Sequence, residues 1–210
     1  MKNIIAKSFT TILIAMVTFL DAQTINRYGT TTANFLEIGI GSRATSMGDA
    51  YVAVANDVSS IYWNPAGLSH VARSSALFSI QPWLVDIDMM FAGGAFVVPS
   101  VGVIGLGITH LDYGEMDVTN LEYQDGTGER FGASDVAATF TFSRKIVSWF
   151  SFGSSMKYIS SKIWHSSASA FAVDLGVLVN TNFFSFTGKD KDGMNICLLY
   201  TSPSPRDNTG

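Results

Sequence analysis

Some residues in this 210-residue chain could take part in cofactor binding, but they fall short of the pattern that this chemistry requires. Residues 39–44 (GIGSRA) fit a dinucleotide-binding fingerprint on paper. That motif needs a buried strand before it, a helix after it and an acid about 20 residues further on. Residues 35–38 make a poor strand. We therefore interpret the stretch as a flexible glycine turn and predict no cofactor.

The histidines and acidic residues do not form a metal-binding pattern either. His70, His110 and His165 are scattered and lack the i, i+4 spacing of a helical metal site. The acids within residues 112–125 lack the regular alternation and closing glutamate of a calcium loop, so we interpret them as part of a solvated loop. The chain contains no G-x-S-x-G elbow. The sequence predicts neither a metal centre nor an enzyme.

The most specific arrangement in the chain is a turn near the end of residues 35–69, a stretch rich in glycine, alanine and serine. Pro65 presets φ for the second turn position, Asn64 can bond its own downstream backbone, and Gly67 can relieve the exit. Upstream, Asp57 or the asparagine before it can cap a short helix. We expect a compact plug that folds back on itself. The turn consists of Trp63, Asn64, Pro65, Ala66 and Gly67.

Further along the chain, apolar and polar residues alternate with period two, which predicts six half-buried strands. These stretches of about 9 to 13 residues match strands that cross a bilayer better than the 5–6 residues typical of soluble sheets. Alternation alone leaves a soluble β-sandwich and a soluble barrel as alternatives. The stretches are residues 73–81, 88–98, 101–111, 133–144, 148–160 and 168–179.

One face of the predicted strands is apolar. The other has small residues and the charges Asp135, Lys157 and Asp174, as the wall of a wet lumen would have. Longer and shorter connections alternate, as in a barrel with two unlike ends. If the tight turn at residues 145–147 centres on Ile146, Asp135 lies opposite Lys157 on the lumen face.

The first 22 residues have the layout of a cleaved secretory signal. Lys2 and Lys7 precede an apolar run at residues 9–20, and Ala22 supplies the small residue before the cleavage point. The run is shorter than the roughly 20 residues that a transmembrane helix needs. We therefore expect an exported protein whose residues 1–22 are removed.

The composition excludes several classes of protein. Charged residues make up 14% of the chain, below the roughly 25% of soluble domains. The net charge of −4 argues against nucleic-acid binding, which requires a basic patch. The single cysteine excludes an internal disulfide framework.

Residues 35–69 resemble the N-terminal hatch of the FadL-type outer-membrane transport proteins, and more closely that of the related PorV/PorQ family. The resemblance covers residues 35–179. It implies an all-β, antiparallel transmembrane β-barrel of about fourteen strands, of which this chain would form an open sheet of about six. The hatch would be residues 23–71 and the barrel wall residues 73–196. The matching positions are Arg43, Met47, Gly48, Ala50, Val52, Val54, Asp57 and residues 62–68 (YWNPAGL).

The resemblance also implies a location in the bacterial outer membrane and a role in transport or secretion. One role in this group is the passage of hydrophobic small molecules, with the turn at residues 63–67 as part of the gate. Another is service as an outer-membrane component of type IX secretion, which handles secreted proteins. A structural or adhesive surface barrel without a conducted substrate is a third possibility. The expected partners are membrane lipid and one of these cargoes.

Residues 197–210 (CLLYTSPSPRDNTG) depart from the alternating pattern before them. Pro203 and Pro205 each remove a hydrogen-bond donor from a β-ladder, and residues 206–208 are too polar to face lipid. We interpret this stretch as a non-native tail, similar to translated adapter or vector sequence, and expect it to lie outside the barrel wall.

Overall fold

The computed structural model describes residues 33–83, 87–119, 121, 123–124, 126–181 and 194–206. The predicted signal (1–22), the start of the predicted hatch (23–32) and the end of the predicted tail (207–210) lie outside these residues. The fold is therefore described from residue 33 onward.

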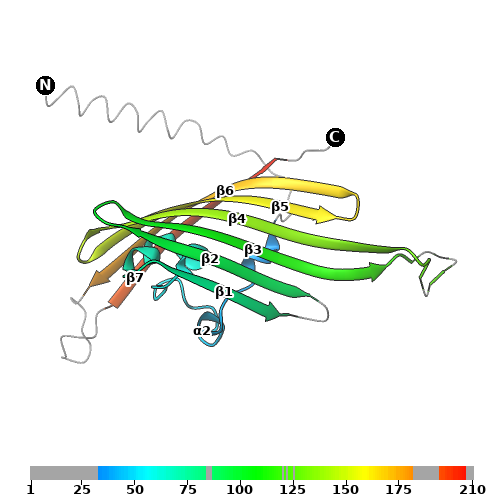
Figure 1. Cartoon of the computed structure of the whole chain (residues 1–210), viewed down its shortest axis with the longest axis horizontal. Coiled ribbons are helices and arrows are strands. Elements are labelled where there is room, and N and C mark those ends of the chain that lie inside the picture. Colours follow the sequence, from blue (N-terminus) through cyan, green and yellow to red (C-terminus); the bar gives the residue numbers. More distant parts are fainter. Residues whose placement is uncertain are drawn as a thin grey trace, which may run out of the picture. The chain divides into compact units, whose positions relative to one another are not determined.

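The described residues form one open sheet of seven antiparallel strands, ordered as in the chain. Strands β1 to β6 lie side by side in Figure 1, and β1 and β7 form the two edges of the sheet. The expected all-β, antiparallel open sheet is confirmed, with seven strands in place of about six. The strands are β1 (Ser75–Pro82), β2 (Asp88–Val98), β3 (Gly102–Asp117), β4 (Arg130–Val147), β5 (Phe150–Ile163), β6 (Ser166–Thr181) and β7 (Met194–Arg206).

Strands β3 and β4 run further than the alternation predicts. The sequence assigns residues 112–132 to a long loop, but β3 ends at Asp117 and β4 begins at Arg130. The register shifts between Asp112 and Glu115, so the alternation is broken while the pairing continues. The Arg130 guanidinium joins the two strand ends, 3.0 Å from Asp117 and 3.3 Å from Glu115.

The sheet also continues beyond residue 196, where the predicted wall ends. β7 pairs with β6 as far as Arg206, and Pro203 and Pro205 face Ala172 and Ala170 in the ladder. Two prolines spaced two residues apart turn their nitrogens to the same side of a strand. An edge strand accepts them when that side is the open one. The sequence predicts that the wall ends before residue 197. The pairing of β7 as far as Arg206 shows that the prolines do not end the sheet there.

The predicted register of the β4–β5 hairpin is wrong. Asp135 pairs with Ser161, and Lys157 pairs with Thr139, because the turn lies at residues 148–149 and not around residue 146. A slip by an even number of residues leaves every side chain on its face, so the apolar pattern determines facing but not the partner. Asp135 and Lys157 do share one face.

The N-terminal segment (residues 33–71) packs against one face of the sheet through short helices, which are grouped on one side of the strands in Figure 1. None of the helices among the described residues is long and apolar enough to cross a bilayer. The Asp57 carboxylate accepts a hydrogen bond from the Ser59 N–H at 2.9 Å. Ser59 is itself the N-cap of α3 and no side chain caps this helix, so the expected cap by residue 56 or 57 is wrong. The helices are η1 (Asn34–Glu37), α2 (Ser42–Thr45), α3 (Ser60–Trp63) and η2 (Pro65–His70).

The hydrophobic core lies between the N-terminal segment and the sheet. We call the contacted side the inner face of the sheet and the opposite side its outer face. The segment contributes Phe35, Ile61 and Leu68, and the inner face contributes Phe91 and Ile159, all with exposed fractions of 2% or less. The core therefore fixes the segment on the face opposite Phe140 and Phe142.

A cysteine cross-link distinguishes the observed register from the predicted one. Thr141 and Ser155 face each other, with hydroxyl oxygens 2.8 Å apart. We expect Thr141→Cys with Ser155→Cys, in a Cys197→Ser background, to form a disulfide, since paired residues have the required Cα spacing. Thr141→Cys with Ser151→Cys is the control and should stay reduced, because four residues of slip separate the Cα atoms by about 13 Å. Electrophoresis without reductant measures both, and cross-linking of the control alone would contradict this register.

Candidate functional site

The turn at residues 63–67 is held by the side chain of Asn64, which has no exposed surface. Its Oδ1 accepts a hydrogen bond from the Ala66 N–H at 3.0 Å, and its Nδ2 donates one to the Val52 carbonyl at 3.0 Å. Pro65 is the first residue of helix η2. The predicted bond from Asn64 to its downstream backbone is therefore present, and a second bond ties the turn to the chain upstream.

Gly67 has a different role from the predicted one. Its φ is not among the positive values in the segment, so it does not relieve the exit from the turn. A Cβ at this position would overlap the carbonyl oxygen of Ala55. Gly67 is thus needed for the close approach of two backbone stretches.

Tyr62 and Trp63 tie the helical turns of the segment together. The Tyr62 hydroxyl lies 2.7 Å from the carbonyl oxygens of Leu36 and Ile38, and the Trp63 indole N–H donates to the Ile40 carbonyl at 3.2 Å. Burial, with a smaller effect of nearby carboxylates, raises the pKa of Tyr62 well above its usual value. The hydroxyl therefore keeps its proton and remains a donor.

The segment rests on two pairs of glycines that face each other across neighbouring strands of the inner face. Gly153 pairs with Gly176, and Gly93 pairs with Gly107. A Cβ on Gly153 would overlap the Pro65 carbonyl group, and one on Gly176 would overlap the Asn64 amide. A Cβ on Gly107 would lie 2.9 Å from Ile61. The small residues interpreted above as a wet lumen wall therefore admit the segment's backbone and side chains.

The three predicted lumen charges all lie on the inner face, but they form two separate groups. Lys157 Nζ lies 2.8 Å from Asp174 Oδ2 on the neighbouring strand β6. Asp135 accepts hydrogen bonds from the Tyr113 hydroxyl at 2.8 Å and from the Ser161 hydroxyl. The expected pairing of Asp135 with Lys157 is therefore wrong, because the true register places each beside a different partner.

Two contacts escaped the sequence analysis. The Lys157 ammonium lies 6.0 Å from the centre of the Tyr62 ring, which links the charge pair to the segment. The Asn180 amide lies 3.3 Å from His70 Nε2, and burial lowers the pKa of that histidine. A sequence signal for the surface that contacts the segment is the glycines that pair across neighbouring strands, Gly93 with Gly107 and Gly153 with Gly176.

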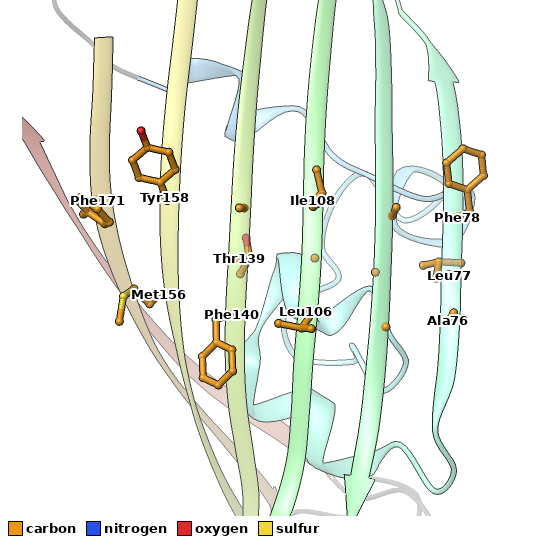
Figure 2. A pocket seen from close by; sticks show the side chains of 15 residues that line it. Ala76, Leu77, Phe78, Leu106, Ile108, Thr139, Phe140, Met156, Tyr158 and Phe171 are labelled. Atoms are coloured by element: carbon orange, nitrogen blue, oxygen red, sulfur yellow. The ribbon is translucent and has the colours of Figure 1, made fainter.

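The outer face is apolar and exposed. The side chains of Phe78, Phe140 and Phe171 are exposed by 66%, 50% and 50%. They surround a hollow of about 810 Å³ that extends from β1 to β6. Figure 2 shows them on the near side of the strands, with the N-terminal segment passing behind. The other large side chains around the hollow are Leu77, Leu106, Ile108, Met156 and Tyr158.

The chemistry available to the described residues is that of packing, hydrogen bonding and one buried ion pair. No three histidine, cysteine, aspartate or glutamate side chains converge on one point within the part of the chain that the structure describes. No family model, curated protein or solved structure matches the chain. A functional interpretation therefore rests on the two faces of the sheet and on the residue pattern of the segment.

Replacing a glycine under the segment should loosen the segment from the sheet. We expect Gly153→Ala to lower the free energy of unfolding by about 1–3 kcal/mol, since the added methyl group overlaps backbone that cannot rotate away. Gly94→Ala is the matched control, because the nearest atom to its Cβ is 3.5 Å away on Phe96. Urea titration of the full chain in detergent micelles, followed by tryptophan fluorescence, measures both. Equal losses in the two variants would show that the glycine pair is not a packing requirement.

Removing the Asn64 amide should destabilise the segment for a different reason. Asn64→Ala leaves the Ala66 N–H and the Val52 carbonyl without their partner, which costs about 1–3 kcal/mol. Asn56→Ala is the control, because the partner of the Asn56 amide among the described residues is the exposed Arg43 side chain. Limited proteolysis should cut the Asn64 variant faster within the segment. A resistance equal to that of the Asn56 variant would contradict the assigned role.

Proposed function

We propose that this chain builds the wall of a bacterial outer-membrane β-barrel of the PorV/PorQ (FadL-like) type, with the N-terminal segment as its hatch. Its role would be transport or secretion across the outer membrane. The observation that carries the proposal is the separation of the two faces of the sheet. The inner face holds polar groups and the segment, and the outer face is apolar and exposed.

The outer face supports a lipid environment through its continuity across strands. Phe78, Ala92 and Ile108 are neighbours in one row of the sheet, and the row continues across β4 to Tyr158 and Phe171. Burying one such large side chain gains about 1.5–3 kcal/mol, so a whole exposed face is costly in water. Against hydrocarbon the same face needs no protein layer to cover it.

The borders of this apolar region support the same proposal. Along β4 the outer-face residues run from Ser134, through Phe140 and Phe142, to Arg144. Ser134 lies beside Asp112 and Lys162 on the neighbouring strands. At the other end Arg144 is polar by itself, since its neighbour on β5 is Phe152. An apolar stretch that ends in polar residues is the arrangement expected of a strand that crosses a bilayer.

The inner face favours a gated pathway over a purely structural or adhesive barrel. A structural wall has no need of a segment that is fitted to the sheet through cross-strand glycine pairs. The nature of the cargo is a separate question. The hollow of about 480 Å³ beside the segment is lined by Asp57, His70 and Arg73 as well as by Val58 and Leu77. This mixed lining does not select hydrophobic small molecules over secreted proteins.

Spin labels on single cysteines, in a Cys197→Ser background and with the protein in lipid bilayers, test the proposal. We expect labels at Leu106→Cys and Phe140→Cys to collide with dissolved oxygen, which concentrates in hydrocarbon. Labels at Ser134→Cys and Arg144→Cys should collide with a water-soluble nickel complex, because they lie at the polar borders.

The opposite pattern would sink the membrane assignment. A soluble β-sandwich would leave the chain monodisperse without detergent and would hide positions 106 and 140 from both reagents under a second layer of protein. A nickel complex that reached these two positions in bilayers would likewise exclude lipid as their cover.

A further inference from the structure

A buried ion pair lies on the inner face of the sheet. Lys157 on β5 and Asp174 on β6 are 2.8 Å apart, and their side chains are only 10% and 4% exposed. Across the ladder, Lys157 faces Ala172 and Asp174 faces Ser155, so the pair is diagonal. Ion pairs on the face of a sheet are usually hydrated. The low exposure of the Lys157–Asp174 pair therefore requires another part of the chain to cover it.

The N-terminal segment covers this pair. The Tyr62 ring centre lies 6.0 Å from the Lys157 ammonium. Two residues beyond Asp174, on the same face of β6, Gly176 contacts Asn64 and Pro65. The burial of both ions thus depends on the segment being seated on the glycine pair.

The pair is not fully satisfied in its buried position. Asp174 Oδ1 is buried and has no hydrogen-bond partner among the described residues. Taking two charges out of water is costly, and their attraction offsets this cost only when the remaining lone pairs are also bonded. The unpaired oxygen therefore leaves part of the desolvation cost uncompensated. Hydration of both groups would relieve that cost as soon as the segment lifts.

We infer that the Lys157–Asp174 pair is a release element for the N-terminal segment. It lowers the free energy of the lifted state, in which both ions are hydrated, relative to the seated state. The core contacts of Ile61 and Leu68 stabilise the seated state, and the ion pair reduces this stabilisation. The inference rests on the proposed function only for the purpose of this movement, which would be the opening of the hatch.

The test is the rate at which a cysteine beneath the segment reacts with a maleimide. Ser143→Cys, in a Cys197→Ser background, is suitable, because Ser143 is fully buried and its hydroxyl donates to the Ala66 carbonyl at 3.2 Å. We expect the apolar pair Lys157→Met with Asp174→Leu to slow labelling in detergent micelles about tenfold or more. Asp174→Asn alone should accelerate labelling, since it leaves the Lys157 charge buried without its counter-ion.

The single and double variants should change the labelling rate in opposite directions. This difference distinguishes a release element from a structural salt bridge. If the pair simply held the segment down, the double variant would label faster than the parent, and that result would overturn the inference. Labelling at the parent rate would overturn it as well. Should the apolar double variant fail to fold, the uncharged pair Lys157→Gln with Asp174→Asn carries the same expectation of slower labelling.

Two controls complete the experiment. Arg130→Gln removes two exposed ion pairs between the ends of β3 and β4 and should leave the labelling rate unchanged. The β-sheet circular dichroism of every variant should match that of the parent. The outcome is also independent of the membrane assignment. The spin labels can exclude lipid while the maleimide rates of the variants still rank as expected. Conversely, the maleimide rates can contradict the inference while the spin labels report lipid.

Discussion

The structure depends on how closely the backbone of the N-terminal segment approaches the sheet. Residues 64–66 lie where the side chains of Gly153 and Gly176 would be if these residues were not glycines. Because the two glycines face each other across β5 and β6, they make one gap two strands wide. The burial of Asn64 and the exclusion of water from the Lys157–Asp174 pair both follow from this contact.

The contact also determines the character of each face. Successive side chains of a strand point to opposite faces of the sheet. The residues that face the segment therefore alternate along each strand with residues that point to the outer face. The inner set combines the core residues Phe91 and Ile159 with small and polar residues, among which Ser143 and Thr141 are fully buried. The outer set is large and apolar, with Phe142 between Thr141 and Ser143 in sequence. A single sheet thus has one face that packs against the segment and an opposite apolar face that is exposed among the described residues.

The sequence predicts correctly on which face of the sheet a side chain lies, but it does not predict which residue that side chain contacts. Both results have one physical reason. Period-two alternation determines the side on which Asp135, Lys157 and Asp174 lie, and all three share the inner face. It is blind to a slip of two or four residues, so it could not place Asp135 beside Tyr113 rather than Lys157.

Alternation also fails wherever a bulge interrupts it. The residues between Asp112 and Glu115 therefore read as a loop although they join two paired stretches of strand. The bond from Asn64 to Ala66 was predictable because it is local in sequence, within two residues. The contact of Tyr62 with Lys157 was not, because it depends on how two distant parts of the chain meet.

The position of the segment in the chain has a consequence for the order of folding. Neighbouring strands pair as hairpins, so most of the sheet can form from contacts that are close in sequence. The segment instead reaches Ser143 from Ala66, 77 residues away, and Asn180 from His70, 110 residues away. It is synthesised first, yet its seat exists only after β4, β5 and β6 have assembled. Until then Ile61 and Leu68 have no surface to pack against, and the newly made chain must keep them from self-association.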